Sequence, residues 1–253
     1  MNQSIINLII SIKHGLKKFN YQKTNLFKTK NNKVTDPVTK LDIKIEKYIR
    51  SKIKSKFPMH SIIGEELSNK NDDDENKWFI DPIDGTKNYL MDLPTWSNLI
   101  GFYHKRKPEV GFANFPMLEK CYFAYHKRTY LISSNNKKII KSNKKTRLKN
   151  AKIAINTFRT TKIKKIRKFI NSFKGIFRIT GCDAYNFCLI AEGKVDVLIE
   201  SGLKQVDILP LIPIIENSGA IITNWRGEKN FKKGDILVTG NPNLHKKLIK
   251  IIN

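Results

Sequence analysis

The chain has 253 residues, with 40% hydrophobic and 28% charged side chains and a formal net charge of +26. A chain of this length can bury a large core, and the apolar and aromatic residues along it exclude global disorder. Every apolar run is shorter than the ~20 residues that cross a bilayer, so we expect a soluble, cytoplasmic protein with no membrane partner. Three cysteines without a CxxC or Cys/His cluster argue against a disulfide framework.

The positive charge is unevenly distributed. No acidic residue lies between Glu119 and Asp183, whereas residues 120–178 carry 19 Lys and Arg. Only 8 of the 48 basic residues are Arg, and Lys, Asn and Ile dominate the composition, which is typical of A/T-rich codons. This excess of basic residues could reflect compositional drift, or its positive field could attract an anionic small molecule. We do not expect nucleic acid as the partner, because no Arg-rich arm, zinc module or aromatic RNA-binding motif accompanies the charge.

The periodicity of apolar residues predicts two helices at the start of the chain, over 4–19 and 42–57, the second stopped by Pro58. A short strand over 60–63 leads into Gly64-Glu65-Glu66, and a polar loop is expected over 68–76. A buried strand over 78–80 ends at Asp81. Alternation over 96–104 and 109–132 predicts antiparallel strands, with turns near Lys107-Pro108 and at Pro116.

A polar, Lys/Asn-rich stretch over 133–150 favours a division of the chain into residues 1–140 and 141–253. After it, the pattern predicts alternating strands (151–156, 176–179, 195–199, 219–224) and helices (161–173, 183–192, 207–218), with a closing helix over 243–252. This alternation is typical of α/β architecture.

The densest chemical feature is the segment Asp81-Pro82-Ile83-Asp84-Gly85-Thr86, which directly follows the buried strand. Two carboxylates three residues apart on such a turn repel each other unless a hard cation neutralises them, and Mg²⁺ prefers oxygen ligands of this kind. Glu65 and Glu66 follow the preceding strand and could supply a third carboxylate. Asp207 opens a late helix, where an acidic side chain also suits the helix N-terminus.

These segments resemble the signatures of the inositol monophosphatase superfamily of Mg²⁺-dependent, Li⁺-sensitive phosphatases, and the resemblance covers nearly the whole chain. It rests on Gly64-Glu65-Glu66, on residues 81–86 and on Asp207, with further similarity at residues 38–42, 57–60 and 225–227. The resemblance implies an αβαβα sandwich, with an antiparallel sheet in the N-terminal half and a mixed sheet in the C-terminal half. It also implies a homodimer.

The resemblance further implies the site residues. Glu65, Asp81 and the carbonyl oxygen of Ile83 would hold one Mg²⁺, while Asp81, Asp84 and Asp207 would hold a second. Glu65 could share a third ion through waters, and Mn²⁺ could replace Mg²⁺. Thr86 and Asp42 would orient and help to deprotonate the attacking water. The backbone N–H groups of Gly85 and Thr86 would hold the phosphate.

Within the superfamily, the second half of the chain resembles the histidinol-phosphatase branch. The resemblance rests on Gly181-Cys182-Asp183-Ala184-Tyr185, on Glu200-Ser201-Gly202-Leu203-Lys204, and on Lys87 with Leu93-Pro94-Thr95-Trp96. Histidinol phosphate carries a cationic amine and an imidazole, which carboxylates at Asp183 and Glu200 would suit. Asp183 could instead, or also, cap the following helix. Arg178 could contact the phosphate or form a surface ion pair.

The implied substrate is therefore a small phosphate ester. The main hypothesis is histidinol-phosphatase activity in histidine biosynthesis. The alternatives are an inositol-1-monophosphatase or a 3′(2′),5′-bisphosphate nucleotidase, which the lysine-rich field would suit. A non-catalytic protein that binds RNA is disfavoured, because every expected metal position carries a carboxylate.

Overall fold

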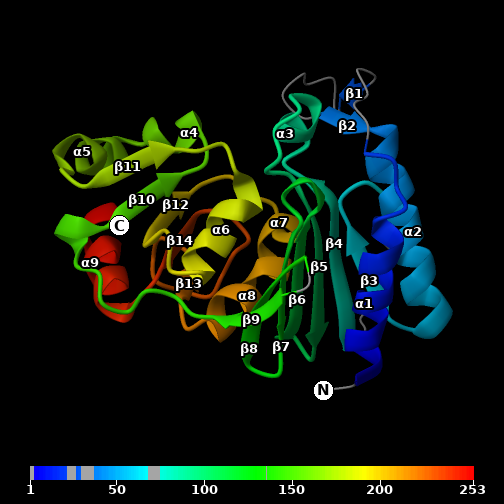
Figure 1. Cartoon of the computed structure of the whole chain (residues 1–253). Helices are drawn as coiled ribbons and strands as arrows, with labels where there is room; N and C mark the ends of the chain where they lie inside the picture. Colours follow the sequence, from blue (N-terminus) through cyan, green and yellow to red (C-terminus); the bar gives the residue numbers. More distant parts are fainter. Residues whose placement is uncertain (1–2, 22–26, 30–36, 68–74, 135) are drawn as a thin grey trace.

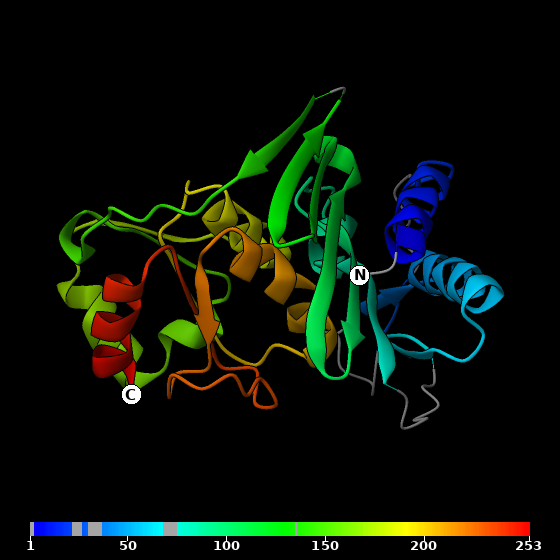
Figure 2. The same ribbon diagram turned by 90° about the horizontal axis from the view of Figure 1, so that it is seen from below.

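The computed structural model describes residues 3–21, 27–29, 37–67, 75–134 and 136–253. Its elements form five layers, which run from α1 and α2 through a seven-stranded sheet, a central helix layer and a five-stranded sheet to α5 and α9 (Figures 1 and 2). The expected αβαβα sandwich is confirmed. Within the described residues, no helix is both long and apolar enough to cross a membrane.

The elements before the central layer are α1 (Gln3–Leu16), β1 (Phe27–Thr29), β2 (Pro37–Thr39), α2 (Lys40–Lys56), β3 (Ser61–Gly64), β4 (Asn76–Asp84), α3 (Thr86–Leu90), β5 (Ser97–His104), β6 (Lys107–Phe115), η2 (Pro116–Leu118), β7 (Lys120–Tyr125), β8 (Arg128–Ser133) and β9 (Asn136–Ile140). Strands β3 to β9 form the seven-stranded sheet in sequence order. It is antiparallel as expected except for the parallel pair β3–β4.

The remaining elements are η3 (Leu148–Asn150), β10 (Lys152–Ile155), α4 (Phe158–Thr161), α5 (Lys164–Ser172), β11 (Ile176–Ile179), α6 (Asp183–Ala191), β12 (Val197–Glu200), α7 (Gln205–Ile208), η4 (Leu209–Leu211), α8 (Ile212–Asn217), β13 (Ile221–Thr223), β14 (Ile236–Thr239) and α9 (Pro242–Ile252). The second sheet has the order β11-β10-β12-β14-β13. It is mixed as expected, because β10 runs parallel to β11 and β12 while β14 runs antiparallel to both neighbours.

Several boundaries differ from the sequence prediction. The hairpin turn expected near Lys107-Pro108 is formed by Lys105 and Arg106, both with positive φ. Strand β9 lies inside the stretch predicted to be a linker, and β14 was not predicted. The helix predicted over 207–218 is split into α7, η4 and α8 around Pro210 and Pro213, because proline removes a helical N–H donor. Of the loop predicted over 68–76, residues 68–74 lie outside the described residues, and Asn76 already belongs to β4. The change of sheet falls between 140 and 152, and the division into two halves stays a prediction.

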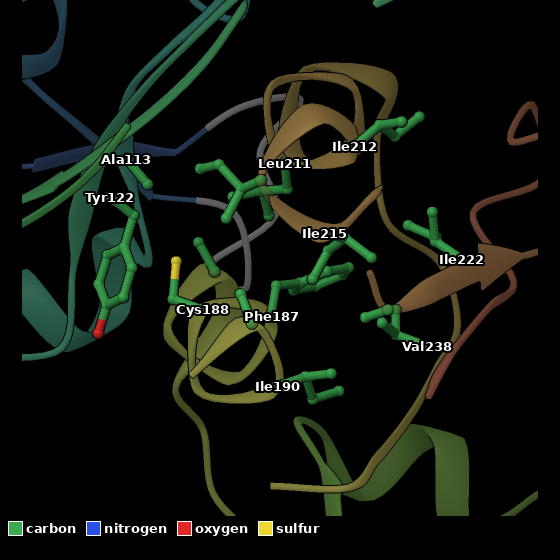
Figure 3. Packing of buried hydrophobic residues seen from close by; sticks show 14 of the residues in the cluster. Ala113, Tyr122, Phe187, Cys188, Ile190, Leu211, Ile212, Ile215, Ile222 and Val238 are labelled. Atoms are coloured by element: carbon green, nitrogen blue, oxygen red, sulfur yellow. The ribbon is translucent and has the colours of Figure 1, made fainter. Parts of the chain in front are cut away.

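The central helix layer consists of α6, α7, η4 and α8. Its apolar side chains pack against both sheets and form much of the largest core cluster. Figure 3 shows Tyr122 from the seven-stranded sheet facing Cys188 of α6, with Ile222 and Val238 of the five-stranded sheet on the other side. Alternation along β12 explains how one strand serves two layers. Leu198 faces this core, whereas Val197 and Ile199 face the outer cluster with α5 and α9.

Two glycines let the central layer approach the seven-stranded sheet closely. A Cβ atom on Gly111 would lie 2.4 Å from the carbonyl oxygen of Pro210 in η4, and one on Gly101 would lie 2.8 Å from its Cα. These contacts are with backbone, so a larger residue forces the two layers apart.

We therefore expect Gly111→Ala to lower the free energy of unfolding by about 1–3 kcal/mol, because overpacking must displace backbone here. Urea unfolding followed by circular dichroism measures the effect. Lys107→Ala is the control, because Lys107 is exposed on the same strand. If the two variants were equally stable, the close contact between Gly111 and the backbone of Pro210 would not limit the size of residue 111.

Candidate active site

The candidate site is a cleft of about 280 Å³ whose walls come from both halves of the chain. The end of β3, the end of β4 and the start of α3 form one side. The segment after β10, the turn before α6 and the start of α7 form the other. The lining residues are Glu65, Asp81, Ile83, Asp84, Gly85, Thr86, Lys87, Asn88, Asn156, Thr157, Gly181, Leu203 and Asp207.

A β-bulge in β4 brings Asp81 and Asp84 to the same cleft. In a regular strand, residues three apart point to opposite faces. Here Asp81 pairs with Leu99 while Asp84 pairs with Ser97, so β4 carries one extra residue between them. The Asn98 side chain donates a hydrogen bond of 2.7 Å to the Pro82 carbonyl oxygen, which stabilises the bulge.

Three carboxylates meet in this cleft. Glu65, Asp81 and Asp207 each offer an oxygen atom, and these oxygens lie within 4.8 Å of one another. Asp81 is buried, and its Oδ1 has no hydrogen-bond partner among the described residues. Burial raises the pKa of Asp81 well above its usual range, and the charges of Glu65, Asp84 and Asp207 raise it further. An oxygen-rich cluster with an unpartnered buried oxygen fits a hard divalent cation. The structure therefore brings together three of the four expected metal-binding side chains.

The fourth, Asp84, lines the same cleft and connects it to the second half of the chain. Its Oδ2 accepts a hydrogen bond of 2.9 Å from the backbone N–H of Ala184, in the first turn of α6. Ser97 donates a longer hydrogen bond of 3.4 Å to the same oxygen. A negative charge is favourable at this end of a helix. Asp84 thus ties β4 to α6 while it faces the cleft.

Thr86 and Gly85 form the turn from β4 into α3. Gly85 has a φ of 80°, a left-handed conformation that glycine adopts without strain. The Thr86 hydroxyl donates a hydrogen bond of 3.0 Å to the carbonyl oxygen of Ile83. Because that bond uses the single hydroxyl proton, the Thr86 oxygen is left as an acceptor toward a group in the cleft.

Asp42 is buried and is not among the residues that line the cleft. It belongs to the capping box of α2, in which its Oδ2 accepts hydrogen bonds from the backbone and the hydroxyl of Thr39. Its Oδ1 is buried without a hydrogen-bond partner in the described part of the chain. Burial raises the pKa of Asp42 to about 6, against the hydrogen bonds from Thr39, and the charge of Glu65 adds to the rise.

The structure places the three expected substrate-selecting residues in three different surroundings. Arg178 is exposed on β11, an edge strand, and is not among the residues that line the cleft. Asp183 is the first residue of α6, so the capping position belongs to Cys182. Glu200 is 1% exposed and does not line the cleft either.

The buried carboxylate of Glu200 holds part of the cleft wall in place. It accepts hydrogen bonds from the backbone N–H of Asn156 at 2.5 Å and from the Thr160 hydroxyl at 2.6 Å. The Thr157 hydroxyl lies 3.3 Å away. Since Asn156 and Thr157 line the cleft, Glu200 acts on the site through them.

Sequence reasoning missed several residues of the site. Asn88 of α3 donates hydrogen bonds to the carbonyl oxygen of Gly181 and to the Thr95 hydroxyl, which joins the two walls. Lys204 is indicated only by the resemblance, yet its ammonium forms an ion pair with Glu65. Asn98, which bonds to the Pro82 carbonyl oxygen, has no sequence signal. These are polar residues without a local pattern. Two of their contacts span 93 positions (Asn88 to Gly181) and 139 positions (Lys204 to Glu65).

The chain matches the model of the inositol monophosphatase family over residues 3–253. The bifunctional phosphatase IMPL2 (chloroplastic) of Arabidopsis thaliana is 32% identical over 198 residues, which is 76% of this chain and 56% of that protein. The fructose-1,6-bisphosphatase/inositol-1-monophosphatase of Aquifex aeolicus is 32% identical over 222 residues, which is 85% of this chain and 81% of that protein.

A histidinol-phosphatase of Chlorobaculum parvum is 26% identical over 227 residues, which is 85% of this chain and 83% of that protein. Among solved structures, the extragenic suppressor protein SuhB of Bartonella henselae superposes with a TM-score of 0.86 at 21% identity, covering 99% of this chain and 98% of that one. This likeness shows the shared fold.

Proposed function

Because the chain belongs to the inositol monophosphatase family, we propose that it hydrolyses a small phosphate monoester with Mg²⁺ as its metal. The observation that carries this proposal is the convergence of Glu65, Asp81 and Asp207 within 4.8 Å, from positions up to 142 residues apart. A phosphate ester is anionic, and cations at such a cluster offset its repulsion of the attacking oxygen.

We assign the metal ligands as the resemblance implies. Glu65, Asp81 and the Ile83 carbonyl oxygen would hold one Mg²⁺, and Asp81, Asp84 and Asp207 a second. When bound, Mg²⁺ would lower the pKa of the attacking water and stabilise the leaving oxygen. Mn²⁺ could take the same places, because it shares the preference for oxygen ligands.

The chain's own residues would then position the water and the ester. Thr86, whose proton is committed to Ile83, would accept a hydrogen bond from the attacking water and so orient it. Asp42, with a pKa of about 6, would help to take up the proton. The backbone N–H groups of Gly85 and Thr86 would hold the phosphate at the cleft wall.

We propose histidinol phosphate as the substrate. The similarity to a histidinol-phosphatase and the resemblance at Gly181 to Tyr185 and Glu200 to Lys204 support it. Asp183 would pair with the cationic amine of the leaving group. Glu200 would contribute indirectly, because it holds Asn156 and Thr157 at the cleft.

Inositol 1-phosphate is the second candidate. The Aquifex aeolicus relative, which carries inositol-1-monophosphatase in its name, is more similar to this chain than the Chlorobaculum parvum histidinol-phosphatase is. An inositol ring is a neutral polyol, so it needs no carboxylate partner for its leaving group.

The test is side-by-side hydrolysis of histidinol phosphate, inositol 1-phosphate and adenosine 3′,5′-bisphosphate, with Mg²⁺ and with EDTA. We expect phosphate release only with Mg²⁺, and the highest kcat/KM for histidinol phosphate. A higher kcat/KM for another ester would refute the substrate assignment but keep the phosphatase. Equal rates in EDTA would refute the metal-dependent mechanism.

We also propose that the protein is a cytoplasmic homodimer. We expect the dimer contact in the region of the antiparallel sheet. Light scattering would give twice the mass of 29.3 kDa if the expectation holds.

A further inference from the structure

Lys204 links two members of the carboxylate cluster. Its ammonium lies 2.8 Å from Oε1 of Glu65, a residue 139 positions earlier in the chain. Its backbone N–H donates a hydrogen bond of 2.7 Å to Oδ2 of Asp207. The Lys204 side chain is 49% exposed and that of Glu65 is 13% exposed, so the pair lies at the edge of the cleft.

The ammonium neutralises this cluster only in part. Glu65, Asp81 and Asp207 carry oxygens within 4.8 Å of one another, and Asp84 faces the same cleft. A single positive charge at Glu65 leaves the buried Oδ1 of Asp81 without a partner among the described residues. A divalent cation has more charge and accepts several oxygen ligands at once. Such an ion and the ammonium would compete for the carboxylate of Glu65.

We propose that Lys204 is an internal counter-ion, which holds Glu65 while the site lacks metal and is displaced when a divalent cation binds. The inference rests on the proposed function, since it takes Glu65 as a metal ligand. The backbone N–H of Lys204 can keep its bond to Asp207, so only the flexible side chain has to move. Lys204 therefore weakens metal binding and stabilises the metal-free protein.

Lys204→Met tests this, because it keeps most of the side-chain volume and removes the charge. We expect Mg²⁺ to bind the variant about threefold to tenfold more tightly in isothermal titration calorimetry, as an exposed ion pair and a nearby like charge are both removed. In EDTA we expect the melting temperature of the variant to fall by about 2–4 °C. Saturating Mg²⁺ should abolish that difference.

Two matched variants make the result specific. Lys87 lines the same cleft, and no ion pair of its side chain occurs in the described structure, so Lys87→Met removes one charge without removing the contact to Glu65. Lys204→Arg keeps a cation at the position and should keep the weaker, wild-type affinity.

The outcomes distinguish failure of the counter-ion role from failure of the proposed function. Equal tightening in Lys87→Met and Lys204→Met would overturn the counter-ion role and leave the metal site intact. Unchanged affinity in Lys204→Met would do the same. If the wild-type chain bound no Mg²⁺ at all, the proposed function itself would fail, and the inference with it.

Discussion

Asp81→Asn is expected to stabilise the metal-free protein and to lower the phosphatase activity at least about a thousandfold. Asp81 is buried beside three other carboxylates, and its pKa is raised well above the usual range. A carboxyl group whose pKa is raised by folding opposes folding at neutral pH, so a neutral side chain of the same shape should stabilise the metal-free protein. The proposed metals would lose their shared ligand, which accounts for several kcal/mol of transition-state stabilisation.

The measurement is a pair of melting curves, in EDTA and in Mg²⁺, with phosphate-release kinetics on the same samples. Wild type should gain stability from Mg²⁺, whereas the variant should start higher and gain little. Glu75→Gln is the control, because it removes one exposed negative charge just before the same strand. A variant that is less stable than wild type in EDTA would show that repulsion does not dominate at Asp81.

Acid is expected to destabilise the protein through His245. This residue of α9 is 7% exposed, and its two ring nitrogens contact the hydroxyls of Thr223 at 2.9 Å and Thr239 at 3.0 Å. Burial lowers the pKa of His245 from 6.5 to about 4. The unfolded chain therefore binds a proton before the folded chain does. The stability is fully present above pH 6.5 and is lost as the pH falls toward 4, by about 3 kcal/mol.

His245→Gln isolates this contribution, because glutamine can still hydrogen-bond but does not titrate. Urea unfolding in EDTA between pH 7.5 and pH 4 should give a shallower loss of stability for the variant than for wild type. The comparison is needed because Asp42 acts in the opposite direction. Its pKa is raised to about 6, so the folded state gains stability as Asp42 protonates. Parallel pH profiles of wild type and variant would disprove the role of His245.

The sequence was sufficient to predict the acidic side of the cleft. Two carboxylates three residues apart behind a buried strand, with an earlier Glu65, indicate a shared cation, and the structure brings these residues together. The bulge that makes this possible was not predictable. It depends on the pairing of β4 with β5 and on Asn98, which show no local pattern in the sequence.

Glu200 shows why the substrate-selecting residues were harder to predict. A carboxylate near the end of a strand suggests contact with a cationic ligand. Three of its donors, Asn156, Thr157 and Thr160, lie 40–44 positions earlier and reach it because β10 and β12 run side by side. Strand β14 was missed for a related reason. It is four residues long, and it pairs only with β12 and β13, which both precede it in the chain.

Helices α6 and α7, which lie between the two sheets, are synthesised late, and the cleft depends on them. Asp81 and Asp84 leave the ribosome well over a hundred residues before Asp207, and α6, which anchors Asp84, also comes late. A nascent chain that ends before α7 holds an incomplete set of acidic groups. Catalytic competence should therefore arise late in translation, when the last third of the polypeptide docks, and a prematurely terminated product should be inert toward phosphate esters.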